Sequence, residues 1–112
     1  MVLSDYGFGK IKVDGKFLKS DFKIFNGKVI ENWWRKEGHR LYLEDIPEIH
    51  EKPLKLIVGK GYFSMMKIDD EVVKFCRENG IELISEKSKK AVEIFNEEKE
   101  KEKILFCIHL TC

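Results

Sequence analysis

The stretch that most constrains the fold is residues 54–80, LKLIVGKGYFSMMKIDDEVVKFCRENG. It begins with a short apolar run, which is typical of a strand buried on both faces, as in a parallel sheet. Gly59 and Gly61 give the following loop backbone freedom. Apolar residues spaced over 72–76 then predict an amphipathic helix, which Asn79-Gly80 ends. The stretch therefore predicts a strand, a glycine loop and a helix, the unit from which α/β sheets are built.

The segments that follow extend this pattern. Residues 81–84 predict a second strand, so the chain passes from one strand through a helix to a parallel neighbour, a crossover that is almost always right-handed. Ser88 can cap a second helix, which carries inward-facing apolar residues over 91–95. Residues 104–110 are apolar enough to form a central strand. The carboxyl-terminal half is thus predicted to be an α/β unit of three strands and two helices.

The amino-terminal third predicts an antiparallel β meander. Residues 10–13 alternate between lysine and apolar side chains, and a turn leads from them into an extended segment at 17–25. Asn26-Gly27 is a strong hairpin signal, because both central residues of a type I′ turn need positive φ. A two-residue loop there would place Phe25 opposite Lys28 and Ile24 opposite Val29. We therefore expect three antiparallel strands before the α/β unit.

Composition and charge limit the class of protein. With 112 residues, of which 43% are hydrophobic, the chain predicts a single domain, 1–112. Its 21 basic and 20 acidic residues leave a net charge of +1, so there is no overall field that would attract nucleic acid or an anionic membrane. A nucleic-acid interface would depend on one sheet face lined by Lys10, Lys12, Lys19 and Lys23, and we do not favour it. Lysine and glutamate dominate the charge and glutamine is absent, a composition typical of thermophiles or of a skewed genome.

Neither a membrane span nor a secretory signal is visible in the sequence, because no apolar run is long enough and the amino terminus lacks a basic segment before an apolar one. Three cysteines without a CxxC motif argue for a reducing compartment, so a cytoplasmic location is expected. Cys107, His109 and Cys112 offer three metal ligands within six residues, but a structural zinc site needs a fourth. We expect no metal and no cofactor.

The glycine loop suggests dinucleotide binding, but the pattern does not fit. Gly59-x-Gly61 lacks the third glycine of the fingerprint, whose position is taken by Ser64, and several residues separate the loop from the helix. Asp69 and Asp70 would also place carboxylates on the amide donors that an anion needs. Close packing of the loop backbone is the alternative that we favour.

The segment 33–40, WWRKEGHR, has the most unusual composition in the chain. Two tryptophans beside three cations and an imidazole could hold an anionic or planar ligand through cation–π contacts and charge-assisted hydrogen bonds. The candidate ligand-binding residues are Trp34, Arg35 and His39 from this segment and Gly59, Gly61 and Tyr62 from the loop. In the competing interpretation one tryptophan fills the core and the cations are solvated.

Several motifs, read together, resemble a known family. In order along the chain they are Tyr6-Gly7-Phe8-Gly9-Lys10-Ile11, Ile24-Phe25-Asn26-Gly27, Trp33-Trp34-Arg35, Gly38-His39, Gly59-x-Gly61-Tyr62 and His109-Leu110-Thr111-Cys112. They resemble a small family of uncharacterised domains first seen structurally in a hypothetical protein of a methanogen. Its eukaryotic relatives include an adipogenesis-associated domain protein and a mitochondrial complex I assembly factor. The resemblance implies a three-layer α/β fold with a central mixed sheet, helices and an additional β layer, and it implies no established reaction.

Two functions follow as hypotheses. The first is a non-catalytic binding or assembly protein with a protein partner, because the sequence lacks an acid–base or nucleophile constellation and the family resemblance extends to an assembly factor. The second is a binder of a small anionic molecule, or an enzyme, that uses the Trp34–His39 segment with the Gly59–Tyr62 loop. Catalytic residues and oligomeric state cannot be predicted from the sequence, and we lean towards a protein that is not an enzyme.

Overall fold

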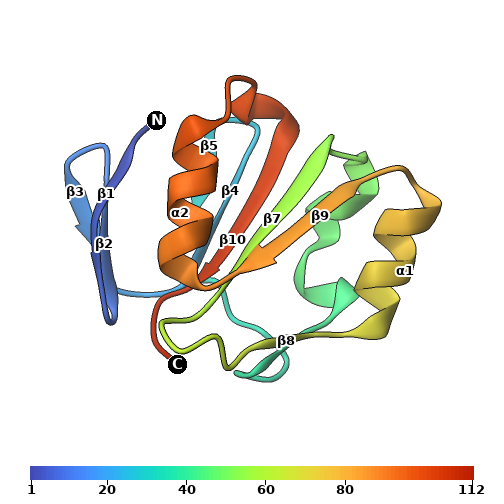
Figure 1. The fold of residues 1–112 in the computed structure, drawn as a ribbon, viewed down its shortest axis with the longest axis horizontal. Coiled ribbons are helices and arrows are strands. Elements are labelled where there is room, and N and C mark those ends of the chain that lie inside the picture. Colours follow the sequence, from blue (N-terminus) through green and yellow to red (C-terminus); the bar gives the residue numbers. More distant parts are fainter.

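The computed structural model describes residues 1–112 as three layers built around a five-stranded mixed sheet (Figure 1). The strands, in spatial order, are β5 (Lys28–Ile30), β4 (Phe22–Phe25), β10 (Ile104–His109), β7 (Lys55–Lys60) and β9 (Glu82–Glu86). β10 lies in the middle, antiparallel to β4 and parallel to β7, and β7 is parallel to β9. The predicted fold class, α/β with a central mixed sheet, is confirmed.

The crossover predicted from residues 54–84 is present. β7 and β9 are parallel neighbours, and α1 (Asp70–Glu78) lies between them in the chain. The Asp69 carboxylate caps this helix by accepting a hydrogen bond from the Glu71 amide at 3.2 Å. The connection also contains β8 (Lys67–Ile68), which pairs in parallel with β6 (Arg40–Leu41) in a separate two-stranded sheet. α2 (Ser88–Glu97) and the short 3-10 helix η3 (Lys101–Lys103) then lead to β10.

The amino-terminal meander exists, but its strands differ from those predicted. Its three antiparallel strands are β1 (Leu3–Gly7), β2 (Lys10–Val13) and β3 (Lys16–Leu18). The extended segment predicted at 17–25 is divided, because the chain leaves the meander after β3 and enters the five-stranded sheet as β4. Asp21, between them, accepts a hydrogen bond at 2.7 Å from the amide of Leu110, the residue directly after β10. The hairpin register is as predicted, with Phe25 opposite Lys28 and Ile24 opposite Val29.

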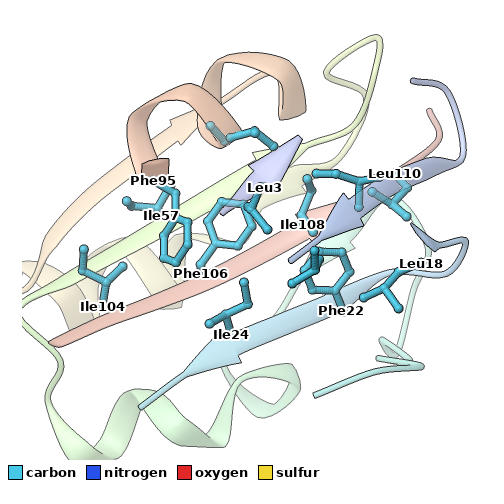
Figure 2. Packing of buried hydrophobic residues seen from close by; sticks show 14 residues of the cluster. Leu3, Leu18, Phe22, Ile24, Ile57, Phe95, Ile104, Phe106, Ile108 and Leu110 are labelled. Atoms are coloured by element: carbon cyan, nitrogen blue, oxygen red, sulfur yellow. The ribbon is translucent and has the colours of Figure 1, made fainter. Parts of the chain in front are cut away.

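Two hydrophobic clusters cover the two faces of the sheet. One lies between the sheet, α2 and the meander (Figure 2), and in it the Phe95 ring of α2 lies 4.7 Å from the Phe106 ring. The other lies under α1 and the 3-10 helices η1 (Leu43–Asp45) and η2 (Pro47–Glu51). Every residue of β10 is buried, and its apolar side chains, at 104–108, alternate between the two clusters. This burial on both faces explains the continuous apolar run of its sequence.

A buried ion pair joins β4 to η2. The Lys23 ammonium lies 2.9 Å from the Glu48 carboxylate and 3.4 Å from the Asp45 carbonyl, so its charge is compensated inside the protein. Lys12 in turn pairs with Asp5 at 3.4 Å. Of the four lysines considered for nucleic acid, Lys23 is therefore buried and Lys12 forms an ion pair. No helix is both long and apolar enough to cross a bilayer.

Candidate functional site

The polar and aromatic residues of interest gather at one edge of the central sheet. β7, β9 and β10 are parallel, so their carboxyl ends meet there, at the lower edge in Figure 1. The amino terminus of β4 reaches the same edge because β4 is antiparallel to β10. In open α/β sheets this is the edge where ligands bind.

Asp21, Arg35 and His109 form a hydrogen-bonded network at this edge. One Asp21 oxygen, Oδ2, accepts from Arg35 Nη1 at 2.8 Å and contacts His109 Nδ1 at 2.6 Å, and the other accepts from the Leu110 amide at 2.7 Å. Arg35 Nη2 donates to the Gly38 carbonyl at 2.9 Å, and the guanidinium lies 4.8 Å from the centre of the Trp33 ring. Burial raises the pKa of Asp21, but the hydrogen bonds from His109, the Leu110 amide and Arg35 outweigh it and hold the pKa below its usual range.

The short contact with Asp21 places a proton on His109 Nδ1, since two acceptors would repel at that distance. The 3.1 Å approach of Arg35 Nη2 to the same nitrogen is then a packing contact. His109 Nε2 is buried and has no hydrogen-bond partner, and Arg35 Nε shares both properties. An oriented imidazole is one half of a nucleophile–base pair, but no hydroxyl or thiol reaches this one. The network as it stands joins β10 to the loops before β4 and β6.

The two tryptophans of the 33–40 segment have opposite environments. Trp33 is only 7% exposed, and its Nε1 donates to the Asp45 carbonyl at 2.9 Å, whereas Trp34 is 88% exposed. Trp34 and Arg35 both line a pocket of about 310 Å³. Its other lining residues are Ser20, Asp21, Asn32, Trp33 and Gly38. His39 is outside that lining; it is exposed, and its ring lies 6.2 Å from the His109 ring.

The three loop residues of the candidate site do not line this pocket. A Cβ on Gly59 would lie 2.9 Å from the Ser88 hydroxyl, and one on Gly61, which has a φ of +108°, would overlap the Cys112 backbone. Ser88 was predicted to cap α2, but it is the first residue of that helix. Its buried hydroxyl accepts from the Gly61 amide at 2.8 Å and donates to the His109 carbonyl at 2.5 Å. The glycines thus allow close packing of the loop.

Tyr62 belongs to a different feature, an exposed cluster of aromatic side chains. Its ring lies 5.8 Å from that of Phe8 and 5.0 Å from that of Phe63, and the Phe8 and Phe63 rings are 6.1 Å apart. Met65 follows in the same loop. These four side chains, between 45% and 61% exposed, are called the aromatic surface below. Tyr6 contacts the Tyr62 ring at 6.2 Å and anchors the cluster through a hydrogen bond to the Leu110 carbonyl.

The sequence reasoning missed Asp21, His109 as its partner, Phe8 and Phe63. Asp21 and His109 are 88 positions apart, so no local pattern links them. A signal for Phe8 and Phe63 did exist, since both are large aromatic residues in glycine-bearing turns where no apolar alternation requires them. Cys107 is fully buried, and burial raises the pKa of its thiol. No three His, Cys, Asp or Glu side chains come together in a way that could hold a metal ion.

The model of a family of proteins of unknown function, DUF498/DUF598, matches residues 3–109. The chain belongs to this family. The resemblance seen in the sequence motifs is thereby confirmed at the level of an uncharacterised domain.

Solved structures share the fold of this DUF498/DUF598 member over nearly its full length. A conserved hypothetical protein from Pyrococcus horikoshii OT3 is 27% identical, with a TM-score of 0.83 and 100% of both chains covered. The structure named MT938 is 25% identical, with a TM-score of 0.77 over 99% of this chain and 98% of that one. A Xanthomonas campestris protein, 16% identical with a TM-score of 0.77 over 97% and 83% of the two chains, shares the fold alone. No curated protein matches the chain.

Proposed function

We propose that this protein is a non-catalytic binding protein that docks a protein partner on its aromatic surface. The observation that carries the proposal is the mutual contact of the exposed Phe8, Tyr62 and Phe63 rings. A contiguous apolar patch is costly to leave in water, and such patches mark interaction sites on soluble proteins. Aromatic side chains are enriched among the residues that dominate binding energy at protein interfaces.

Both loops that carry the aromatic surface are fixed by backbone hydrogen bonds. The Gly9 amide donates to the Leu110 carbonyl at 2.9 Å, next to Phe8. In the other loop, the Tyr62 amide donates to the Thr111 carbonyl at 2.5 Å and the Met65 amide to the Cys112 carbonyl at 2.9 Å. A surface that is already ordered loses little conformational entropy on binding. This preorganisation supports a docking role.

Exposed aromatic side chains can be removed without loss of the core, which allows a direct test. Tagged wild-type protein and the variants Phe8→Ser and Phe63→Ser are used to purify partners from a native extract. Each partner is then produced alone and its dissociation constant measured. We expect each variant to weaken binding at least tenfold, about 1.4 kcal/mol or more, because each removes a central aromatic contact.

The matched control is Leu54→Ser, because Leu54 is an exposed apolar residue directly before β7, at the opposite edge of the sheet. It should bind as the wild type does. Thermal unfolding confirms that all three variants are folded. Partners that bind wild type, Phe8→Ser and Phe63→Ser equally would contradict docking at this surface.

A second candidate function is binding of a small anionic molecule in the pocket beside Trp34. The exposed indole and the Arg35 guanidinium line one pocket of about 310 Å³, so a planar group could stack on Trp34. Asp21 already pairs with Arg35, so a ligand must compete with an internal carboxylate.

Phosphates, carboxylates and nucleotides can be screened by thermal shift. A ligand at a hundred times its dissociation constant adds about 2.7 kcal/mol to the free energy of unfolding, and Trp34→Ala should abolish the gain. A flat response would remove this candidate.

A further inference from the structure

In the two segments that carry the aromatic surface, all charged side chains are positive. Residues 6–10 and 59–68 contain three lysines, Lys10, Lys60 and Lys67, and no aspartate or glutamate, in a chain with 20 acidic residues. None of the three lysines forms an ion pair, whereas Lys12 on the same meander pairs with Asp5. No carboxylate side chain therefore pairs with these three lysines, and the Lys10 ammonium lies 5.6 Å from the centre of the exposed Phe17 ring.

The three lysines flank the exposed rings in the chain. Lys10 opens β2 immediately after the turn that holds Phe8, and it is paired with Gly7 across that turn. Lys60 ends β7 and precedes the Gly61–Tyr62 turn, and Lys67 follows Met65 after one residue. An apolar centre with cations at its borders has the layout of a docking site with a charged rim.

We propose that the aromatic surface accepts an acidic, apolar segment of a protein partner, in which bulky apolar side chains stand within a few residues of aspartate or glutamate. This rests on the proposed docking function and adds the chemistry of the partner. The apolar side chains would pack on Phe8, Tyr62 and Phe63 and supply most of the affinity. The carboxylates would meet the lysines at the rim, where complementary charge speeds association and selects the partner.

The charge pattern disfavours the other occupants. A second copy of the chain in a two-fold dimer would bring this surface against itself, and the lysines would face lysines. Nucleic acid needs a continuous row of cations along its phosphates, but Lys23 is buried and Lys12 is paired. An acidic, apolar protein segment satisfies both the rings and the unpaired lysines.

A phage-displayed library of random peptides, panned on the wild-type protein with counter-selection on Phe63→Ser, tests the chemistry directly. We expect the retained peptides to combine large apolar side chains with carboxylates. A synthetic copy should bind at least tenfold more weakly to Phe8→Ser, and several-fold more weakly to Lys10→Glu and Lys67→Glu. Its affinity should fall with added salt. Lys89→Glu, a change at an exposed and unpaired lysine of α2, is the matched control and should bind as the wild type does.

Each other outcome overturns a defined part of the proposal. Peptides that need Phe63 but lack carboxylates, or that bind Lys10→Glu unchanged, would overturn the charge inference and leave docking at the aromatic surface intact. Failure to obtain any peptide that distinguishes wild type from Phe63→Ser would count against both. Phe63-dependent binding of phosphatidylserine vesicles or of single-stranded oligo-dT in place of peptides would reassign the surface to membrane or nucleic acid. A Phe63-dependent dimer in sedimentation experiments would assign it to a second copy.

Discussion

At the scale of single residues, Asp21 connects the segments that meet at the edge of the sheet. Its carboxylate receives hydrogen bonds from the Arg35 guanidinium, the His109 ring and the Leu110 amide, and the Arg35 side chain is only 4% exposed. Removing one partner of a buried ion pair leaves an uncompensated charge. We expect Asp21→Asn to lower the free energy of unfolding at pH 7 by about 3 kcal/mol, measured by urea denaturation. Glu44→Gln, which removes an exposed pair with Lys36, is the control and should leave the free energy of unfolding almost unchanged.

The stability that the Asp21 carboxylate contributes depends on pH, because the pKa of this group changes on folding. The pKa of Asp21 is lower in the folded state than in the unfolded chain, so the folded state binds the proton less readily. The stabilisation is then complete above the unfolded pKa, about 3.9, and disappears as the pH falls through the folded pKa. The difference in stability between wild type and Asp21→Asn should therefore shrink below about pH 4. A difference that stays constant down to acid pH would show that the Asp21 charge has no such role.

The residue scale also marks the limit of sequence reasoning at the site. Arg35 was identified from local composition, but its partner Asp21 was only one residue of the segment 17–25 that was predicted to be extended. The choice between Trp33 and Trp34 as the core tryptophan was equally open, because both have the same neighbours in sequence. Trp33 is the buried one, and its indole N–H donates to the Asp45 carbonyl, a partner that is fixed only by the folded chain.

At the scale of elements, local signals were read correctly and signals that depend on distant partners were not. The register of the β4–β5 hairpin followed from Asn26-Gly27 because a two-residue turn determines which residues face each other. The break between β3 and β4 could not be found in this way, because Asp21 is fixed by Leu110 at the other end of the chain. Ser88 is a similar case. A serine before an apolar stripe predicts a helix cap, but its hydroxyl bridges the β7 loop and β10.

At the scale of the whole molecule, two connections make the layers one unit. The Asn96 side chain of α2 binds the Leu3 backbone twice, accepting from its amide at 3.0 Å and donating to its carbonyl at 2.7 Å, which holds the meander against the helix. β10 lies between the two hydrophobic clusters and contributes side chains to both. Loss of packing on one face of β10 should therefore weaken the other face as well.

Adjacent residues of β10 allow this coupling to be measured. Phe106 faces the cluster under α2 and Leu105 the cluster under α1, where Trp33 also lies. In a Trp34→Phe background, Trp33 fluorescence reports the second cluster and far-UV circular dichroism reports all elements. We expect Leu105→Ala and Phe106→Ala each to lower the free energy of unfolding by about 3 kcal/mol, with the two signals still changing together. If Leu105→Ala moved the fluorescence transition ahead of the circular dichroism transition, the two clusters would be separate folding units, and β10 would not couple them.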